Sequence, residues 1–321
     1  MSRRRGETVG DYRSPLFMAW QLTNRCSCRC LHCCEESGPE RAWKSELSRD
    51  EAVRIAREAA EMGIPYAAFG GGEPLGVAHV WDVFETLVSG GTLLKIETDG
   101  LLIDERALAR LKELKPASIQ ISLDGAAAET HEALRPGSRF RDVVKTIDRL
   151  ARAGLEPEAV FIPTKLNAGE AAQTYELASS LGARVFVTGP LMRLGRAALD
   201  WERLAPSDED WRACVAALKD VESRLGNRTR LSVYPWDILV EMKTRLDSPQ
   251  AMILVVPDGK VKLLNALPFA AADLRKVSLA SAWEMAKSAW SSPEVRDFIL
   301  RAQTDRSLLA HANECWSLSS R

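Results

Sequence analysis

From residue 17 to about residue 190, short apolar runs alternate with amphipathic helical patterns. The strand-like runs lie at 17–23, 66–69, 93–98, 118–123, 158–163 and 184–188. The helices between them have recognisable ends: Ser48 and Glu51 form a capping box, and Gly63 ends that helix. Strands that alternate with helices form parallel sheets with right-handed crossovers. The pattern therefore predicts an α/β fold.

The number of repeats and the chain after residue 226 define the architecture further. Six strand–helix units are too few for a full eight-unit barrel, so we expect a partial (βα)6 TIM-like barrel. The later chain predicts a hairpin turning at 257–259 and two helices around 279–290 and 294–302. The predicted divisions are a flexible N-terminal tail at 1–15, the barrel at 16–228 and a small α+β C-terminal module at 229–321.

Two further capping boxes are expected in the helical patterns. Asn167 with Glu170 and Ser207 with Asp210 repeat the spacing of the first one. Each pair would begin a helix at the residue that follows its first member.

Composition excludes several classes of protein. The chain has 321 residues, of which 46% are hydrophobic and 27% charged, and its net charge is −1. This balance gives no broad attraction to nucleic acid or to an anionic membrane. No apolar run approaches transmembrane length, and no signal peptide is evident. We therefore expect a cytoplasmic protein without nucleic-acid or membrane partners.

Five of the seven cysteines lie within nine residues, directly after the first predicted strand. They are Cys26, Cys28, Cys30, Cys33 and Cys34. Without a secretory signal, crowded cysteines indicate metal ligands or reactive thiols. A 4Fe–4S cluster usually has four cysteine ligands, so the three in Cys26-x3-Cys30-x2-Cys33 would leave one iron open.

Other uses of these cysteines remain open. A zinc site built from Cys28, Cys30, Cys33 and Cys34 would be geometrically strained. Cys28 and Cys34 would otherwise be a second thiol pair, a redox-sensitive site or incidental residues of a crowded loop.

Glycine-rich and polar segments follow the next three strands. GGGEPLG follows the second strand, ETDG closes the third and SLDG closes the fourth. In a parallel α/β barrel the carboxyl ends of the strands lie on one rim, where loops build active sites. We expect these segments and the cysteines to converge on one site.

Together, in this order, the motifs resemble those of the radical S-adenosylmethionine (radical SAM) superfamily. The resemblance implies one 4Fe–4S cluster on Cys26, Cys30 and Cys33, whose open iron binds S-adenosylmethionine. The cofactor-binding residues that it implies are His32, Gly71, Gly72, Glu73, Pro74, Thr98, Asp99, Ser122, Asp124, Arg135, Arg193 and Arg196. No residue beyond the cluster ligands is assigned a catalytic role.

The resemblance also implies where some of these residues meet the cofactor. His32 matches a position near the adenine, and Ser122 and Asp124 match positions near the ribose. The carboxylate of Glu73 or adjacent carbonyl groups would meet the ammonium of S-adenosylmethionine. Either Arg193 or Arg196 would bind its carboxylate.

The same resemblance implies radical chemistry. In this superfamily the cluster reductively cleaves S-adenosylmethionine, and the resulting 5′-deoxyadenosyl radical abstracts hydrogen from a substrate. We expect that substrate to be a peptide or protein side chain in peptide or cofactor maturation, and the electron donor to be a flavodoxin or ferredoxin. The alternatives are a small metabolite or tetrapyrrole precursor as substrate, or a non-catalytic scaffold that binds S-adenosylmethionine and the cluster.

The C-terminal module resembles a SPASM or twitch extension that caps the substrate site. Met252 and Leu264 stand where cysteines for its auxiliary clusters would be expected, and a lone Cys315 cannot hold a cluster. Trp236 would line the substrate side or pack in the core, and Asp237 is a candidate substrate contact. We expect His79, His131 and His311 to be surface or packing residues, and Cys214 to be a small core residue.

Overall fold

The computed structural model describes residues 8–226 and 228–318. Its strands form one sheet in the order β11-β10-β9-β8-β1-β2-β3-β4-β5-β6-β7. They span Phe17–Thr23 (β1), Tyr66–Gly71 (β2), Leu93–Thr98 (β3), Ser118–Ser122 (β4), Glu158–Phe161 (β5), Val185–Thr188 (β6), Arg230–Val233 (β7), Met252–Val255 (β8), Lys260–Lys262 (β9), Phe269–Asp273 (β10) and Trp316–Ser317 (β11). Neighbouring strands from β1 to β7 are parallel. The predicted α/β fold with a mainly parallel sheet is confirmed.

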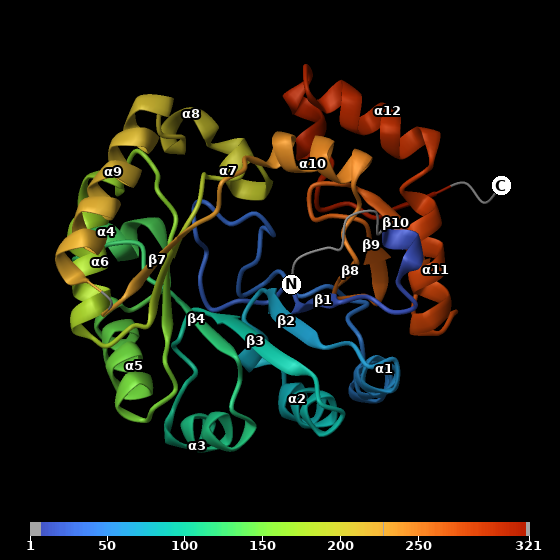
Figure 1. Cartoon of the computed structure of the whole chain (residues 1–321), viewed down its shortest axis with the longest axis horizontal. Helices are drawn as coiled ribbons and strands as arrows, with labels where there is room; N and C mark the ends of the chain where they lie inside the picture. Colours follow the sequence, from blue (N-terminus) through green and yellow to red (C-terminus); the bar gives the residue numbers. More distant parts are fainter. Residues whose placement is uncertain (1–7, 227, 319–321) are drawn as a thin grey trace.

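Helices cover the outer side of the curved sheet (Figure 1). The α-helices are Arg49–Glu61 (α1), Val80–Ser89 (α2), Glu105–Leu114 (α3), Ala128–Leu134 (α4), Phe140–Arg152 (α5), Ala171–Ser180 (α6), Gly195–Leu199 (α7), Trp201–Leu204 (α8), Asp208–Leu225 (α9), Ile238–Asp247 (α10), Leu279–Ala289 (α11) and Pro293–Ala302 (α12). Short 3-10 helices occupy Val9–Asp11 (η1), Pro74–Gly76 (η2), Ala168–Glu170 (η3) and Arg306–His311 (η4). No helix of the described chain is both long and apolar enough to cross a membrane.

Two of the three predicted capping boxes are present. The Ser48 side chain accepts a hydrogen bond from the Glu51 N–H at the start of α1, and Ser207 does the same for Asp210 at the start of α9. The third prediction is wrong, because Asn167 makes no side-chain cap and η3 precedes α6. Asn167 Nδ2 instead donates to the Asp124 carbonyl at 3.1 Å.

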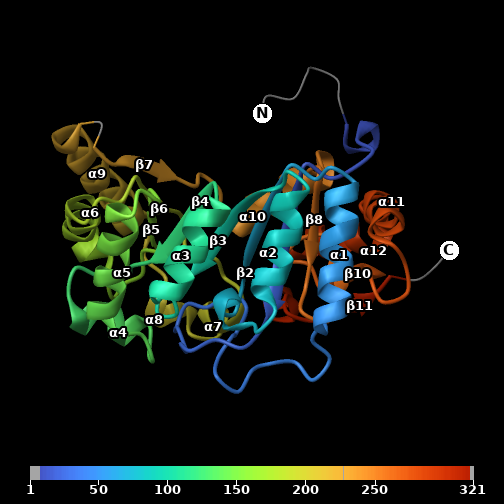
Figure 2. The same ribbon diagram turned by 90° about the horizontal axis from the view of Figure 1, so that it is seen from below.

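The sheet extends past the six predicted strands on both sides. β7 pairs in parallel with β6 just beyond residue 228. β8 pairs in parallel with the other edge of β1 and forms the predicted hairpin with β9. The C-terminal strands therefore continue the barrel sheet (Figures 1 and 2). The predicted division of the chain at residue 228 stays a prediction.

Part of the predicted N-terminal tail, residues 8–15, is described, and residues 1–7 lie outside the described residues. The described part includes η1 and contacts α11: Trp283 Nε1 donates to the Tyr12 carbonyl at 3.0 Å. Leu16, next along the chain, donates its N–H to the Ala251 carbonyl at 2.8 Å. This segment thus joins the start of β1 to the C-terminal part of the chain.

The core lies between the sheet and its outer helices. Trp20, Phe69 and Phe84 form a buried aromatic row, with ring centroids 5.8 Å and 4.8 Å apart. Burying such a side chain stabilises the fold by about 1.5–3 kcal/mol. This packing anchors β1 and β2, the two strands whose carboxyl ends carry the cysteines and the GGEP turn.

Candidate functional site

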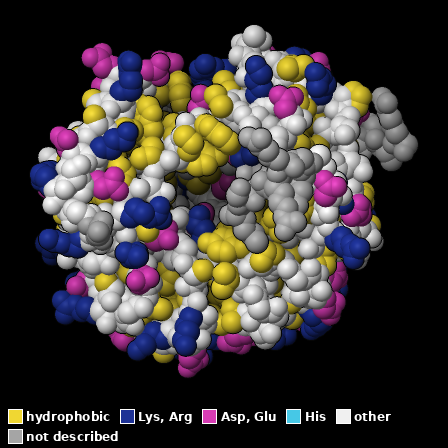
Figure 3. All heavy atoms as spheres, in the orientation of Figure 1, with side chains coloured by type: hydrophobic (Ala, Val, Ile, Leu, Met, Phe, Trp, Pro, Cys, Tyr) yellow, Lys and Arg dark blue, Asp and Glu magenta, His cyan; other side chains and the backbone are white. Residues whose placement is uncertain are grey.

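A cavity of about 440 Å³ lies at the carboxyl ends of the parallel strands. The strands curve around a central space, and Figure 3 shows a hollow there with hydrophobic side chains at its rim. The predicted site residues that line the cavity are Cys26, Cys30, His32, Cys33, Gly71, Gly72, Glu73, Thr98, Asp99, Ser122, Arg135 and Arg196. Pro74, Asp124 and Arg193 lie outside this lining.

The cysteine-rich loop after β1 is held in place by backbone hydrogen bonds from separate segments. The Cys26 N–H donates to the Gly38 carbonyl at 3.0 Å, and the Arg29 N–H donates to the Pro136 carbonyl at 2.7 Å. The Cys33 carbonyl accepts from the Arg196 N–H at 3.0 Å. Because these partners come from elements far apart in sequence, the fold as a whole positions the thiols.

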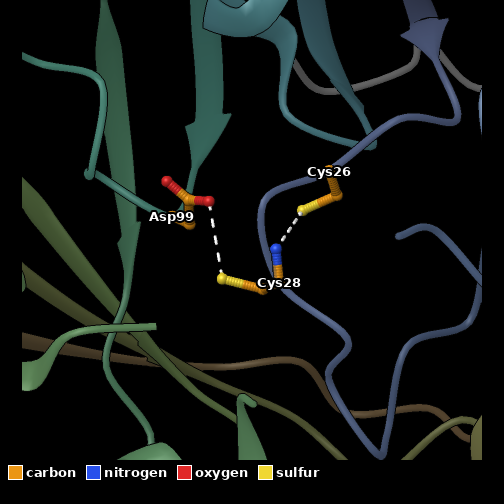
Figure 4. Close-up of side chains that lie close together, drawn as sticks. All are labelled: Cys26, Cys28 and Asp99. Atoms are coloured by element: carbon orange, nitrogen blue, oxygen red, sulfur yellow. Dashed lines mark hydrogen bonds between the residues drawn. The ribbon is translucent and has the colours of Figure 1, made fainter. Parts of the chain in front are cut away.

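Cys28 lies between Cys26 and Cys30. Its N–H donates to Cys26 Sγ at 3.5 Å, and its own Sγ lies 3.6 Å from Asp99 Oδ2 (Figure 4). Cys26, Cys28 and Asp99 bring possible metal-ligand atoms within 4.8 Å of one another. The contact of Cys28 and Asp99 was not foreseen, because it depends on the distance between β1 and β3.

Hydrogen bonds and burial shift the pKa values of these thiols in opposite directions. Bonding to Cys28 lowers the pKa of Cys26, and it lowers the pKa of Cys30 to about 5, with Arg135 adding to the effect. Bonding to Cys26 and Cys30 raises the pKa of Cys28. Burial raises the pKa of Cys33. Since the thiolate is the metal ligand, this pattern suits Cys26 and Cys30 for metal binding better than Cys28.

The turn after β2 packs against the residues that precede the first cysteine. The Gly72 N–H donates to the Thr23 carbonyl at 2.7 Å, and the Glu73 N–H donates to the Arg25 carbonyl at 2.8 Å. A Cβ atom on Gly72 would lie 2.0 Å from the Arg25 carbonyl oxygen. Glycine is therefore required for this close approach, which brings the turn beside the cysteine loop.

The Glu73 carboxylate is buried and engaged within the fold. It accepts from the Thr98 hydroxyl at 2.8 and 2.9 Å, from the Asp99 N–H at 2.8 Å and from the Leu75 N–H at 3.0 Å. Burial and the neighbouring Asp99 charge raise the pKa of Glu73. Both groups predicted to meet an ammonium are thus engaged in part, because the Glu73 and Pro74 carbonyls also accept from the Gly76 and Val77 N–H groups at 3.0 and 3.1 Å.

Asp124 forms a buried charged network behind the cavity wall. Arg135 Nε donates to Asp124 Oδ2 at 2.5 Å, and His32 Nε2 lies 3.1 Å from the same oxygen. Burial opposes ionisation, but Arg135 and His32 together lower the pKa of Asp124. Asp124 has no exposed surface, so it orients the Arg135 and His32 side chains rather than facing the cavity.

His32 and Arg135 present groups suited to a bound cofactor. Arg135 Nη1 lies 3.4 Å from Cys30 Sγ, where its charge would stabilise an anionic cluster. His32 Nδ1 is buried without a hydrogen-bond partner in the described chain. A buried polar atom usually has a partner, so this one fits a ligand that brings a donor or acceptor. These features and the cysteines of the loop fit a cluster with an adjacent organic cofactor.

The two candidate arginines after β6 have different surroundings. Arg196 lines the cavity, and its side chain donates to the Cys30 carbonyl and the Ser37 carbonyl, both at 2.7 Å. Arg193 instead stacks over Trp201, with 5.2 Å from its guanidinium carbon to the ring centroid. Of the pair, Arg196 is therefore the one in contact with the cysteine loop.

Apolar side chains form another part of the cavity wall. They come from β5, β6 and the chain after them, and they include Val160, Ile162, Val187, Leu191, Met192 and Tyr234. Tyr234 takes the place foreseen for Trp236, which instead stacks with Arg245 at 5.1 Å. This wall offers a surface for a substrate beside the cysteine-rich side.

Two supporting residues were not foreseen as parts of the site. His131 accepts from the Asp124 N–H at 3.1 Å through Nδ1, and its Nε2 lies 2.8 Å from the Ser138 hydroxyl. Asn167 holds the Asp124 carbonyl from the other side. Neither residue belongs to a metal-like spacing, so no local pattern in the sequence marked them.

A family model and several known proteins match the part of the chain that carries these residues. The model of the Radical SAM superfamily matches residues 20–178, which contain the cysteines, the GGEP turn and the Asp124 network. The chain belongs to the radical SAM superfamily. Radical SAM proteins use a 4Fe–4S cluster and S-adenosylmethionine, and these are the cofactors of this chain.

Two curated relatives show different extents of similarity. The chain is 32% identical over 195 residues to the mycofactocin maturase MftC of Mycobacterium ulcerans, which covers 60% of this chain and 52% of that protein. It is 26% identical over 294 residues to the AdoMet-dependent heme synthase of Methanosarcina barkeri, covering 85% and 83% of the two chains. The chain spans about half the length of the maturases that it matches.

A solved structure shares the fold. Crystal structures of Streptococcus suis SuiB, bound to S-adenosylmethionine or to the precursor peptide SuiA, superpose with a TM-score of 0.72 in each case. They are 14% and 13% identical to this chain, and they cover 87% and 88% of it and 68% of SuiB. At this identity the likeness concerns the fold alone.

Proposed function

We propose that the chain is an enzyme in which Cys26, Cys30 and Cys33 hold the cluster and the cavity binds S-adenosylmethionine. The observation that carries this proposal is that the three cysteines lie on one loop and all line the same cavity. Backbone hydrogen bonds from separate segments hold that loop in place. When bound, the cluster and S-adenosylmethionine supply a 5′-deoxyadenosyl radical that abstracts hydrogen from the substrate. The protein binds, orients and shields the reactants.

Different side chains would bind different parts of S-adenosylmethionine. His32 would meet the adenine, because its Nδ1 is buried without a partner in the described chain. Ser122, in the cavity wall, would lie near the ribose. Arg196 is the better candidate for the carboxylate because it lines the cavity, whereas Arg193 lies outside that lining. The carbonyls of the turn at 71–74 would face the ammonium.

Other residues would hold this arrangement together. Arg135 would stabilise the negative charge of a cluster bound at Cys30, and Asp124 would hold the Arg135 side chain in that direction. Thr98 and Asp99 would keep Glu73 and the turn after β2 in place. These are positioning roles, since each acts through a neighbour.

We propose a peptide or protein side chain as the substrate, in peptide or cofactor maturation. Support comes from the similarity to a mycofactocin maturase and from the fold shared with SuiB, which binds a precursor peptide. The apolar wall that includes Val187 and Tyr234 suits an apolar or aromatic side chain. A tetrapyrrole precursor or small metabolite is the second candidate, because a heme synthase matches 85% of the chain.

The rest of the chain would serve this reaction. We propose that residues 229–321 form a SPASM- or twitch-like cap without an auxiliary cluster, since Cys315 is the single cysteine there. A flavodoxin- or ferredoxin-type protein would supply the electron. A reducing compartment such as the cytoplasm would keep the seven thiols free of disulfides, as they are in the structure.

Formation of 5′-deoxyadenosine tests the proposal. The anaerobically reconstituted protein, given dithionite and S-adenosylmethionine, should form 5′-deoxyadenosine measurable by mass spectrometry. Cys30→Ala should abolish it, because one cluster ligand is lost. Cys214→Ala is the matched control and should retain it, since Cys214 is buried in α9 away from the cavity. Binding of S-adenosylmethionine without cleavage by loaded wild-type protein would instead favour the scaffold alternative.

A further inference from the structure

A second cavity of about 390 Å³ lies beside the first. Pro190 and Leu191 line both cavities, so a single layer of residues separates them. The second cavity also takes residues from α8, from the starts of α9 and α10, and from η4. Its walls therefore join the end of the barrel to the C-terminal part of the chain.

Two tryptophans and two arginines make the lining of this second cavity both aromatic and positively charged. Trp201 and Trp211 are half-buried in its wall, and Arg193 stacks over the Trp201 ring at 5.2 Å. Arg306 enters from η4 and is exposed. Neither guanidinium forms an ion pair within residues 8–226 and 228–318. An arginine held against an aromatic ring keeps its donors available for a carboxylate.

The acidic side chains of the cavity oppose these charges only in part. Asp237 Oδ1 accepts from the Leu239 and Val240 N–H groups at 2.8 and 2.9 Å, so it is engaged as the N-cap of α10. Asp208 is exposed in the first turn of α9, where the helix dipole offsets its charge. The guanidiniums of Arg193 and Arg306 thus share the cavity with one carboxylate, that of Asp208, that is not engaged as a helix cap.

We propose that this second cavity binds a carboxylate of the peptide substrate while a neighbouring residue of the same peptide enters the first cavity. The shared layer at 190–191 means that a few extended residues, each about 3.3–3.6 Å long, would span both sites. The carboxylate would come from an acidic side chain or from the peptide C-terminus. Arg193 and Arg306 would bind it, and the tryptophans would pack against the adjacent peptide. This inference rests on the proposed peptide substrate.

Binding of short peptides to the holoenzyme tests the inference. The probes are acetyl-Ala-Ala-Glu-Ala-Ala-amide and its Gln counterpart, each carrying an uncharged dye, titrated by fluorescence anisotropy with S-adenosylmethionine present and no reductant. A charge-assisted contact should make the Glu peptide bind about tenfold more tightly. A third peptide, with the Gln sequence and a free C-terminus, distinguishes a terminal carboxylate from a side chain. Tighter binding of either carboxylate peptide supports the inference.

Variants locate the effect. Arg193→Gln and Arg306→Gln should each reduce the preference for carboxylate, and the double variant should abolish it. Arg224→Gln, at the far end of α9 and paired with Glu176, is the matched control and should keep it. Arg306 is exposed, so its variant stays informative even if Arg193→Gln disturbs Trp201.

The inference and the proposed function fail in different ways. Equal binding of all three peptides, no detectable binding at about 1 mM, or a preference that survives the double variant would overturn the second site. None of these results depends on cleavage of S-adenosylmethionine. Conversely, a protein that forms no 5′-deoxyadenosine but shows the arginine-dependent preference would retain the site and lose the proposed chemistry.

Discussion

His131 shows how a single buried side chain supports the site. Its Nδ1 accepts from the Asp124 N–H, so its Nε2 carries the proton and donates to Ser138. This tautomer is neutral, and the ring has no exposed surface. Burial lowers the pKa of His131 to about 4. Protonation would break the bond from Asp124 and place a charge beside Arg135.

The lowered pKa predicts a dependence of stability on pH. An unfolded histidine has a pKa of about 6.5, so between pH 6.5 and 4 the unfolded chain binds a proton that the folded chain does not. Stability therefore falls as the pH falls through this window. From pH 7.5 to 5.5 we expect His131 to account for a decline of about 1 kcal/mol in the free energy of unfolding.

Urea denaturation of His131→Gln at the two pH values checks this expectation. The variant should be less stable than the wild type at pH 7.5, yet lose about 1 kcal/mol less on going to pH 5.5. His311→Gln, which alters a half-buried histidine of η4 in contact with Glu314, serves as the comparison variant and should keep the decline that is due to His131. An equal decline in wild type and His131→Gln would refute the assignment of the proton.

At the scale of elements, the turn after β2 depends on the close approach at Gly72. An added Cβ atom would meet the Arg25 carbonyl oxygen at 2.0 Å, so Gly72→Ala must push the turn away from the cysteine loop. We expect it to lower the free energy of unfolding by about 1–3 kcal/mol and to reduce iron loading. Gly169→Ala has nothing within 4 Å of its Cβ position and is the matched control. Unchanged iron content and urea midpoint in Gly72→Ala would contradict this account.

Local signals explain why much of the fold was predictable. β1 and β3 were predicted with their observed bounds because each is a short strand-like run with several apolar residues, bordered by turn or cap residues. α1 and α9 carry capping boxes that depend on residues three apart. β7 was missed because its four residues, RLSV, are recognisable as a strand only through pairing with β6.

The prediction of the site was limited in the same way, because the sequence shows local patterns but not which distant elements meet. The cysteine and GGEP motifs are short and follow strands, so their convergence at one cavity could be predicted. The contact of Cys28 with Asp99 and the place of Asn167 beneath Asp124 depend on separate elements meeting. Asn167 also matched a capping pattern, which concealed its buried role.

At the scale of the whole molecule, the C-terminal segment reaches back to the cysteine loop. Asn313 Nδ2 donates to the Cys34 carbonyl and to Glu36 Oε2, both at 2.9 Å. The residue follows η4, so it links the last part of the chain to the loop that carries the predicted cluster ligands. The C-terminal part of the chain therefore helps to hold the cysteine loop in place.

Removing this link should expose the cluster. We expect Asn313→Ala to speed the loss of iron in air several-fold while anaerobic iron loading stays near the wild-type level. The decay of cluster absorbance after exposure to air measures the rate. Asn265→Ala, in the connection after β9, is the control for losing an asparagine from the C-terminal part of the chain. Identical decay in Asn313→Ala and wild type would show that the contact does not protect the cluster.

The central claim is that Cys26, Cys30 and Cys33 hold a 4Fe–4S cluster with one open iron, and iron analysis with electron paramagnetic resonance tests it most directly. Reconstituted wild type and Cys28→Ala should each carry about four irons, and their reduced spectra should change on adding S-adenosylmethionine. Single alanine variants of the three ligands should lose the cluster. Loss of the cluster in Cys28→Ala, with retention in Cys30→Ala, would contradict the account and point to Cys26, Cys28 and Asp99 as the metal site.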